Sequence, residues 1–185
     1  MFEKFIPQPF LSALNKINFK QLNEIRFRAF KPVIVYLGGM AYFLSENGIS
    51  TNLQDALICD KESLEEIVFR ASECSIYAVN EQIKNGFLTV GGGYRIGLGG
   101  TAVFENDKLK TIKNFVSLNI RVPHFVKDCS LLAFKHILEN RRLNNTLIIS
   151  PPGAGKTTFL KDFVSQLSQR NFSANVLVLD ERGEI

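Results

Sequence analysis

The stretch TLIISPPGAGKTTFL, residues 146–160, decides how the second part of this chain folds. A short apolar run leads into a loop with two glycines, and a segment with an apolar helical face follows. A second apolar run comes next, at residues 175–180 (NVLVLD). Strand, loop, helix and strand in this order are typical of a parallel sheet, so we predict an α/β fold. The predicted helix carries on one face Leu160, Phe163, Val164 and Leu167.

The loop has the residues that phosphate binding requires. A phosphate needs converging backbone N–H groups at a helix N-terminus, glycines that let the main chain approach, a lysine, and a hydroxyl for magnesium. Gly153, Gly155 and the pair Lys156–Thr157 supply these in the right order, although the general pattern GxxxxGK[ST] has glycine in place of Ser150. We predict a site for ATP and Mg²⁺; the alternative is a glycine-rich turn without a ligand. The predicted binding residues are Pro152, Gly153, Ala154, Gly155, Lys156, Thr157 and Thr158, with Thr157 also a metal ligand.

Three acidic residues follow the second apolar run: Asp180, Glu181 and Glu184. Because parallel strands end at the edge of the sheet where such loops hold phosphate, we expect these acids near the nucleotide. Asp180 is predicted to hold magnesium, and Glu181 or Glu184 to orient an attacking water. The roles can be exchanged among the three, and a charged turn facing solvent is the alternative.

Residues 1–125 have the pattern of an α+β domain with antiparallel strands. Ile25 and Phe27 alternate with arginines, and a β-branched run follows Pro32. Asp60 is placed to cap a helix, and residues 76–84 predict a second helix. The buried face of the capped helix is expected to carry Leu64, Ile67, Val68 and Ala71. Turns are predicted at Gly38–Gly39, Gly91–Gly93, Gly99–Gly100 and Asn106–Asp107.

Between the two domains, residues 126–142 predict a linker helix with Leu131, Phe134 and Leu138 on one side. The second domain then covers residues 143–185.

Two arginines of the first domain, Arg95 and Arg121, are flanked by apolar residues in predicted strands. A planar guanidinium in such a place is suited to a γ-phosphate contributed by a neighbouring domain or subunit. Pairing with a carboxylate on the same sheet is the alternative interpretation.

Composition narrows the class of protein. The net charge of +4 is small, and the three cysteines are widely spaced, which disfavours a disulfide framework or a structural zinc site. The first residues lack the apolar core of a signal peptide, and the most apolar stretch, interrupted by Gly38–Gly39, is too short to span a bilayer. We therefore expect a cytoplasmic protein.

Five motifs in order resemble the stage III sporulation protein AA family of endospore-forming bacteria. They are LNEIRFRAFKPV, GGGYRIGLGGTAV, NIRVPHF, IISPPGAGKTTFLKDF and VLVLDERGEI. That family is grouped with the traffic ATPases of type II and type IV secretion systems, whose motor domain is RecA-like. The resemblance implies an N-terminal α/β domain paired with a RecA-like P-loop ATPase domain, of which residues 143–185 are expected to be the start. It also implies that Ser150 is normal for the family, and that the last motif is an Asp box rather than the Walker B strand.

The resemblance further implies function and partners. Members of the group work as hexameric rings, and Arg95 and Arg121 match arginines that reach the nucleotide. A motor of a sporulation channel, bound to membrane-embedded partner proteins from the cytoplasmic side, is implied. Because a RecA-like core has more strands than residues 143–185 supply, we expect the sequence to be a fragment with little or no turnover of its own.

The sequence leaves two other functions open. One is a P-loop ATPase coupled to single-stranded nucleic acid, which the basic pI allows but the lack of an aromatic and basic stacking platform disfavours. Nucleic acid is therefore not an expected partner. The other is a module that senses nucleotide and changes its assembly without turnover.

Overall fold

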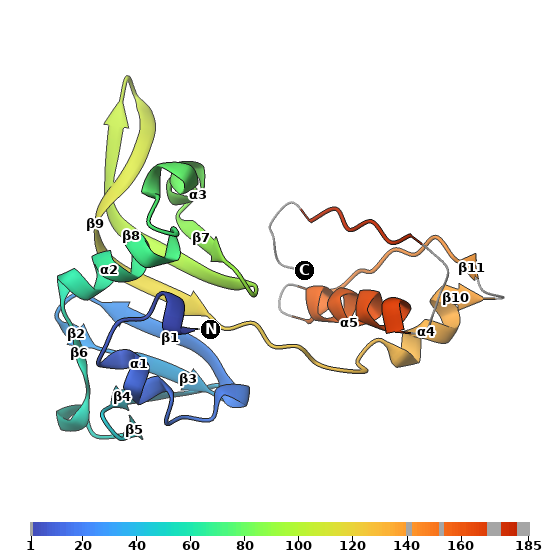
Figure 1. Cartoon of the computed structure of the whole chain (residues 1–185), viewed down its shortest axis with the longest axis horizontal. Coiled ribbons are helices and arrows are strands. Elements are labelled where there is room, and N and C mark those ends of the chain that lie inside the picture. The colour runs from blue at the N-terminus through green and yellow to red at the C-terminus, as the bar shows by residue number, and fades with distance from the viewer. Residues whose placement is uncertain (1, 140–141, 152–153, 170–174, 181–185) are drawn as a thin grey trace. The chain divides into compact units, whose positions relative to one another are not determined.

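The computed structural model of this chain describes residues 2–139, 142–151, 154–169 and 175–180 (Figure 1). The chain divides into two compact units, residues 1–123 and residues 124–185. The first unit is built on a large antiparallel sheet, and the second on two helices. The predicted α/β class is confirmed.

Seven strands form the sheet of the first unit, in the order β5-β4-β3-β1-β9-β8-β7. Every neighbouring pair is antiparallel, as the sequence predicts for this part of the chain. The strands are β1 (Leu22–Arg28), β3 (Ile34–Leu37), β4 (Met40–Ser45), β5 (Gly48–Ser50), β7 (Phe87–Val90), β8 (Tyr94–Glu105) and β9 (Lys108–Arg121). A separate two-stranded ladder joins β2 (Lys31–Pro32) to β6 (Ile58–Cys59). Strands β8 and β9 are much longer than their neighbours, so their far ends project as a hairpin (Figure 1).

Two of the predicted hairpin turns depend on left-handed backbone. Gly38 and Gly39 have φ of +57° and +88°, and Asn106 and Asp107 have φ of +50° and +58°. A two-residue hairpin turn with positive φ at both positions matches the twist of the flanking strands. Both predictions are confirmed, as is the turn at Gly91–Gly93.

The predicted turn at Gly99–Gly100 is wrong. Strand β8 runs through both residues, and its register against β9 shifts between Gly99 and Thr101. Gly100 lies so close to β9 that a Cβ atom there would be 2.7 Å from the carbonyl oxygen of Lys113. Glycine is therefore required here because two strands approach closely at a β-bulge, and not because the chain reverses its direction.

Helices cover one face of this sheet. The helix α2 (Lys61–Ala71) is capped as predicted, because the Asp60 carboxylate accepts a hydrogen bond of 2.7 Å from the Ser63 amide. The predicted helix at residues 76–84 is divided into the 3₁₀ turn η4 (Ile76–Val79) and α3 (Asn80–Lys84). The other elements are η1 (Phe2–Lys4), α1 (Phe10–Leu14), η2 (Phe19–Gln21) and η3 (Leu53–Asp55).

The core of the first unit lies between these helices and the sheet. Its largest fully buried side chains are Phe5, Ile6, Phe10, Leu22, Ile25, Phe27, Leu44, Leu64, Ile67, Ile83, Leu88 and Ile96. Ile25 and Phe27 are buried, while the arginines between and after them lie on the opposite face, as the alternation predicts.

The second unit contains α4 (Leu131–Ile137), a short hairpin of β10 (Leu138–Glu139) and β11 (Arg142–Leu143), and α5 (Lys156–Gln169). Phe134 and Ile137 of α4 pack against Phe163 and Leu167 of α5. The linker helix is shorter than predicted, because the chain turns into β10 at Leu138.

The two apolar runs expected to form parallel strands differ from the prediction. Residues 144–151 and 175–180 have no strand assignment, and all ladders among the described residues are antiparallel. Leu147 is 82% exposed and Leu179 is 93% exposed. An extended segment becomes a strand only when a neighbour pairs with its backbone, and apolar patterning alone does not provide that neighbour.

Candidate phosphate-binding site

The loop before α5 has the backbone that a phosphate site requires. Gly155 has φ of +90°, in the left-handed region, and α5 begins at the next residue, Lys156. Apart from the adjoining residues of the chain, no atom of the described residues lies within 4 Å of the place where a Cβ atom of Gly155 would stand. Glycine is needed here for its backbone conformation and not for lack of space.

The Lys156 ammonium is held over the loop. Its Nζ donates hydrogen bonds to the backbone oxygen of Ser150 (2.7 Å), to the backbone oxygen of Pro151 (3.0 Å) and to the Ser150 hydroxyl (3.1 Å). Ser150, where the general motif has glycine, thus adds a side-chain acceptor for the lysine. An ammonium has three donors, so a phosphate oxygen could replace any of these acceptors without moving the lysine far.

The first turn of α5 completes the loop. The Phe159 amide donates to the Gly155 carbonyl over 2.8 Å, which closes the first helical turn. Thr157 and Thr158 are half-buried in that turn, and Ala154 is exposed in front of it. The N-terminal amides of a helix lack intrahelical acceptors and carry the positive end of the helix dipole, so they suit an anion. The described residues therefore fit a phosphate with magnesium at Thr157, while Pro152 and Gly153 lie outside the described residues.

A buried carboxylate behind the loop was missed by the sequence analysis. Asp162 of α5 is fully buried and accepts hydrogen bonds from the amides of Asp128 (2.9 Å) and Ser130 (2.8 Å). The Ser130 hydroxyl donates a third bond over 2.6 Å. Hydrogen bonds, that from the Ser130 side chain foremost, lower the pKa of the Asp162 carboxyl, so it is ionised at neutral pH. The sequence did contain a signal for this site, because Asp162 directly precedes the apolar residues Phe163 and Val164 of the predicted amphipathic helix.

The predicted acids are only partly described. Asp180 is half-buried in the second unit. Glu181 and Glu184 lie outside the described residues, and their predicted roles stay predictions.

Arg95 and Arg121 stand directly opposite each other on β8 and β9 of the first unit. The Arg95 guanidinium lies over the Phe87 ring, 3.9 Å from its centroid. Arg121 is exposed and forms no ion pair with any residue that the structure describes, and Glu24, opposite it on β1, pairs with Arg26 instead. The alternative of an own-sheet carboxylate is therefore not realised for Arg121.

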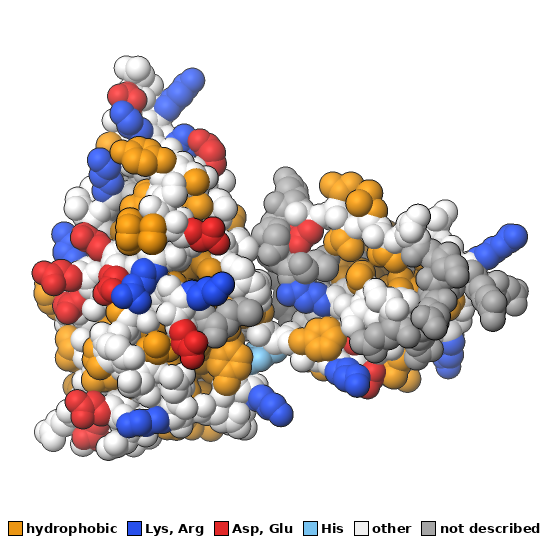
Figure 2. Space-filling view, viewed as in Figure 1, with side chains coloured by type: hydrophobic (Ala, Val, Ile, Leu, Met, Phe, Trp, Pro, Cys, Tyr) orange, Lys and Arg blue, Asp and Glu red, His pale blue; other side chains and the backbone are white. Residues whose placement is uncertain are grey.

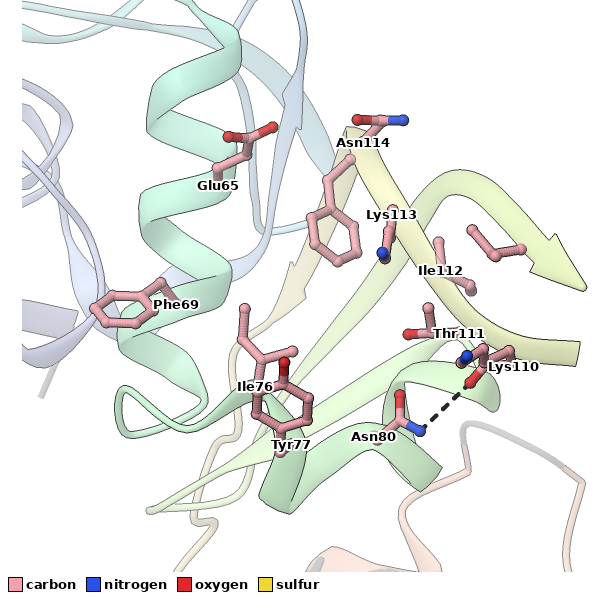
Figure 3. Close-up of a pocket in the computed structure, with 12 residues that line it drawn as sticks. Glu65, Phe69, Ile76, Tyr77, Asn80, Lys110, Thr111, Ile112, Lys113 and Asn114 are labelled. Carbon is pink, nitrogen blue, oxygen red and sulfur yellow. Dashed lines mark hydrogen bonds between the residues drawn. The ribbon is translucent and has the colours of Figure 1, made fainter. Parts of the chain in front are cut away.

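A groove of about 950 Å³ on the first unit was not predicted. It lies between α2, η4 and the β8–β9 hairpin, where Figure 2 shows hydrophobic side chains at the surface. Tyr77 is 96% exposed and Phe69 is 47% exposed at its edge. Figure 3 shows Lys110 on the hairpin wall, where its backbone oxygen accepts a bond of 3.4 Å from Asn80. The sequence contained one signal for this groove, the apolar pair Ile76–Tyr77 within a polar stretch.

Comparison with known proteins decides the family. Residues 10–185 match the family described as Sporulation stage III, protein AA. This chain belongs to that family. It is also 32% identical over 186 residues to Stage III sporulation protein AA of Bacillus subtilis (strain 168), covering 97% of this chain. The chain spans 57% of the length of that relative.

Solved structures of secretion ATPases are also similar to this chain at low identity. They include the VirB11 ATPase of the Brucella suis type IV secretion system in complex with sulphate (15% identity, TM-score 0.36, 80% of this chain and 40% of that chain). The pilus retraction motor PilT with bound ADP gives 15% identity and a TM-score of 0.42, with 80% and 40% covered. The Legionella pneumophila ATPase DotB gives 14% identity and a TM-score of 0.38, with 80% and 38% covered.

The part of the chain that the structure describes contains no group of three or more histidine, cysteine, aspartate or glutamate side chains that could hold a metal ion. In the same ranges, no helix is long and apolar enough to cross a membrane.

Proposed function

We propose that this protein binds and hydrolyses ATP as the motor of a sporulation-associated secretion or channel complex. The observation that carries the proposal is the loop that ends at Gly155, with its left-handed backbone, the adjoining helix start and the Lys156 ammonium held over it. Membership of the sporulation family supports the biological setting.

The chemistry divides among the loop, the acids and the arginines. Lys156 neutralises the β- and γ-phosphates, while Thr157 and Asp180 hold Mg²⁺, which offsets negative charge on the phosphates. Glu181 or Glu184 polarises the attacking water. The amides of the first turn of α5 bind the phosphate oxygens.

Arg95 and Arg121 contribute from the first unit. Like charges placed directly opposite on neighbouring strands destabilise a sheet. The Phe87 ring under Arg95 offsets part of this repulsion through a cation–π contact. The pair places two guanidinium groups side by side, an arrangement suited to an anion, which supports their proposed contact with the γ-phosphate.

The proposed assembly follows from the family alone. The protein works as a ring, expected to be a hexamer, and lies at the cytoplasmic side of the membrane through embedded partner proteins. ATP and ADP are its ligands, and the proposal includes no nucleic acid.

The test uses two lysines of the same helix. Lys156→Ala removes the ammonium from the loop, whereas Lys161→Ala makes the same change one turn further on, outside it. Hydrogen bonds to charged groups contribute about 1.5–3 kcal/mol each, so we expect Lys156→Ala to weaken Mg-ATP binding by about 10-fold or more in calorimetry. ATP turnover by a full-length protein should fall by about 100-fold or more, and Lys161→Ala should leave both unchanged. Equal affinity and turnover for the two variants would refute the proposed function.

A further inference from the structure

Two neighbouring stripes on α5 contact other parts of the second unit. The apolar stripe of Phe159, Phe163 and Leu167 packs on α4, with the Phe134 and Phe163 rings 4.9 Å apart. The second stripe is Thr158, Asp162 and Gln166, spaced four residues apart and therefore on one side of the helix.

The whole second stripe contacts one turn of the chain, residues 128–130. The Thr158 carbonyl accepts a bond of 3.7 Å from the Cys129 thiol, and the Gln166 amide donates to the Asp128 carboxylate over 2.7 Å. Between them, Asp162 accepts the three bonds from Asp128 and Ser130 described above. The turn is held in register, because each of its three residues bonds to α5, where Asp128 and Ser130 share Asp162 as a partner.

The turn stands at a junction. It lies a few residues after the end of the first unit at Pro123, and it leads directly into α4. At the other end of the same contact, Thr158 belongs to the first turn of α5, two residues after Lys156. Asp162 is six residues after Lys156, about 9 Å along the helix axis.

We propose that Asp162 is a positioning residue that couples the phosphate loop to the segment joining the two units. A helix moves as a rigid rod over this distance, so a shift of its first turn on nucleotide binding displaces Asp162. The displacement passes to residues 128–130 through the three hydrogen bonds. This inference rests on the proposed function, because it needs a nucleotide at the loop.

A residue that only stabilises the fold would have the same contacts, so the test needs a nucleotide-dependent readout. Hydrogen exchange of the peptide covering residues 124–131 is measured with and without Mg-ATP, alongside calorimetry on the same samples. Asp162→Asn keeps the shape but replaces a carboxylate oxygen by an amide donor that faces other donors. Ser130→Ala removes only the hydroxyl bond to Asp162, and this variant replaces Asp162→Asn in the test if the latter does not fold. Asp55→Asn is the matched control, since Asp55 accepts a hydroxyl bond of 2.8 Å from Ser50 in the first unit.

In the unaltered chain, Mg-ATP should slow exchange at residues 124–131 by about fivefold or more, a typical coupling between sites. Asp162→Asn should abolish this response and Ser130→Ala should reduce it, while Asp55→Asn should retain it. ATP affinity should fall far less than in Lys156→Ala. Binding of ATP without slower exchange in the unaltered chain would overturn the coupling alone. So would a full response in Asp162→Asn. Absence of ATP binding would overturn the proposed function together with the coupling.

Discussion

Replacing Gly100 with alanine should destabilise the first unit, because backbone atoms occupy the space that a side chain would need. A Cβ atom there would lie 2.7 Å from the carbonyl oxygen of Lys113 and 2.9 Å from Cγ2 of Ile112. The carbonyl belongs to β9 and cannot rotate away as a side chain can. Overpacking of this kind lowers the free energy of unfolding by about 1–3 kcal/mol, and we expect a loss in that range.

Two other glycines of β8 are matched controls. A Cβ atom at Gly97 would have its nearest neighbours at 3.8 Å, an ordinary contact. Gly97→Ala should therefore stabilise the unit by about 0.4–1 kcal/mol, because alanine reduces the entropy of the unfolded chain. At Gly99 the new methyl group would meet the Ser117 hydroxyl, which can rotate. The change in the free energy of unfolding for Gly99→Ala should therefore lie between those for Gly97→Ala and Gly100→Ala.

Tyrosine fluorescence during urea unfolding measures these changes in the first unit. The chain has no tryptophan, and its four tyrosines all lie within residues 1–123. The Gly100→Ala midpoint should fall by roughly 1 M urea for a typical slope of the transition. Equal midpoints for Gly97→Ala and Gly100→Ala would show that no close approach exists at Gly100, and would favour the turn that the sequence predicted there.

Three further outcomes are expected. Asp60→Ala removes the cap of α2 and should lower the free energy of unfolding by about 1 kcal/mol in the same urea assay. Hydrogen bonds from Ser63 lower the pKa of Asp60, so this stabilisation should be complete above the unfolded pKa of about 4 and disappear as the pH falls through the folded value. Arg121→Ala should lower ATP turnover and leave the free energy of unfolding within about 0.5 kcal/mol, because Arg121 faces a like charge (Arg95) on β8 and an opposite charge (Glu24) on β1; an unchanged turnover would contradict its proposed contact with the γ-phosphate. Cys129 is exposed, but partial desolvation of its thiol and, after it, the Asp162 charge raise the thiol pKa, so Asp162→Asn should speed maleimide labelling of Cys129; an unchanged rate would exclude that charge effect.

Local signals predicted most of the first unit. The turns at Gly38–Gly39 and Asn106–Asp107 were identified because positive φ at two consecutive positions is a property that few residue types accept. The cap at Asp60 was identified for a similar reason, since it involves atoms only three residues apart. At Gly99–Gly100 the same logic failed, because glycine also serves close approach of strands. Whether a glycine pair forms a turn or a close strand contact depends here on Lys113, which lies on another strand and far away in the sequence.

In the candidate site, too, features formed by neighbouring residues were predicted and features formed by distant residues were not. The loop from Ser150 to Lys156 is contiguous in the sequence, so spacing alone was enough to identify it as a candidate site, and its binding of phosphate stays a prediction. Asp162 was missed because its partners, Asp128 and Ser130, are 34 and 32 residues away in the sequence. The parallel strands were predicted from apolar composition. Such composition indicates that a segment will be buried, but it does not indicate which backbone will pair with that segment.

The two stripes of α5 have different mechanical consequences. An apolar contact such as that of Phe163 on Phe134 is non-directional, and it tolerates small sliding of one helix along the other. Hydrogen bonds to the Asp162 carboxylate are directional and lose strength within a few tenths of an ångström and a few tens of degrees. Burial sharpens this difference, because a carboxylate without water must keep its donors or lose its charge. If α5 slides along α4, its apolar packing can therefore adjust, whereas the hydrogen bonds to Asp162 favour movement of the turn at residues 128–130 together with the helix.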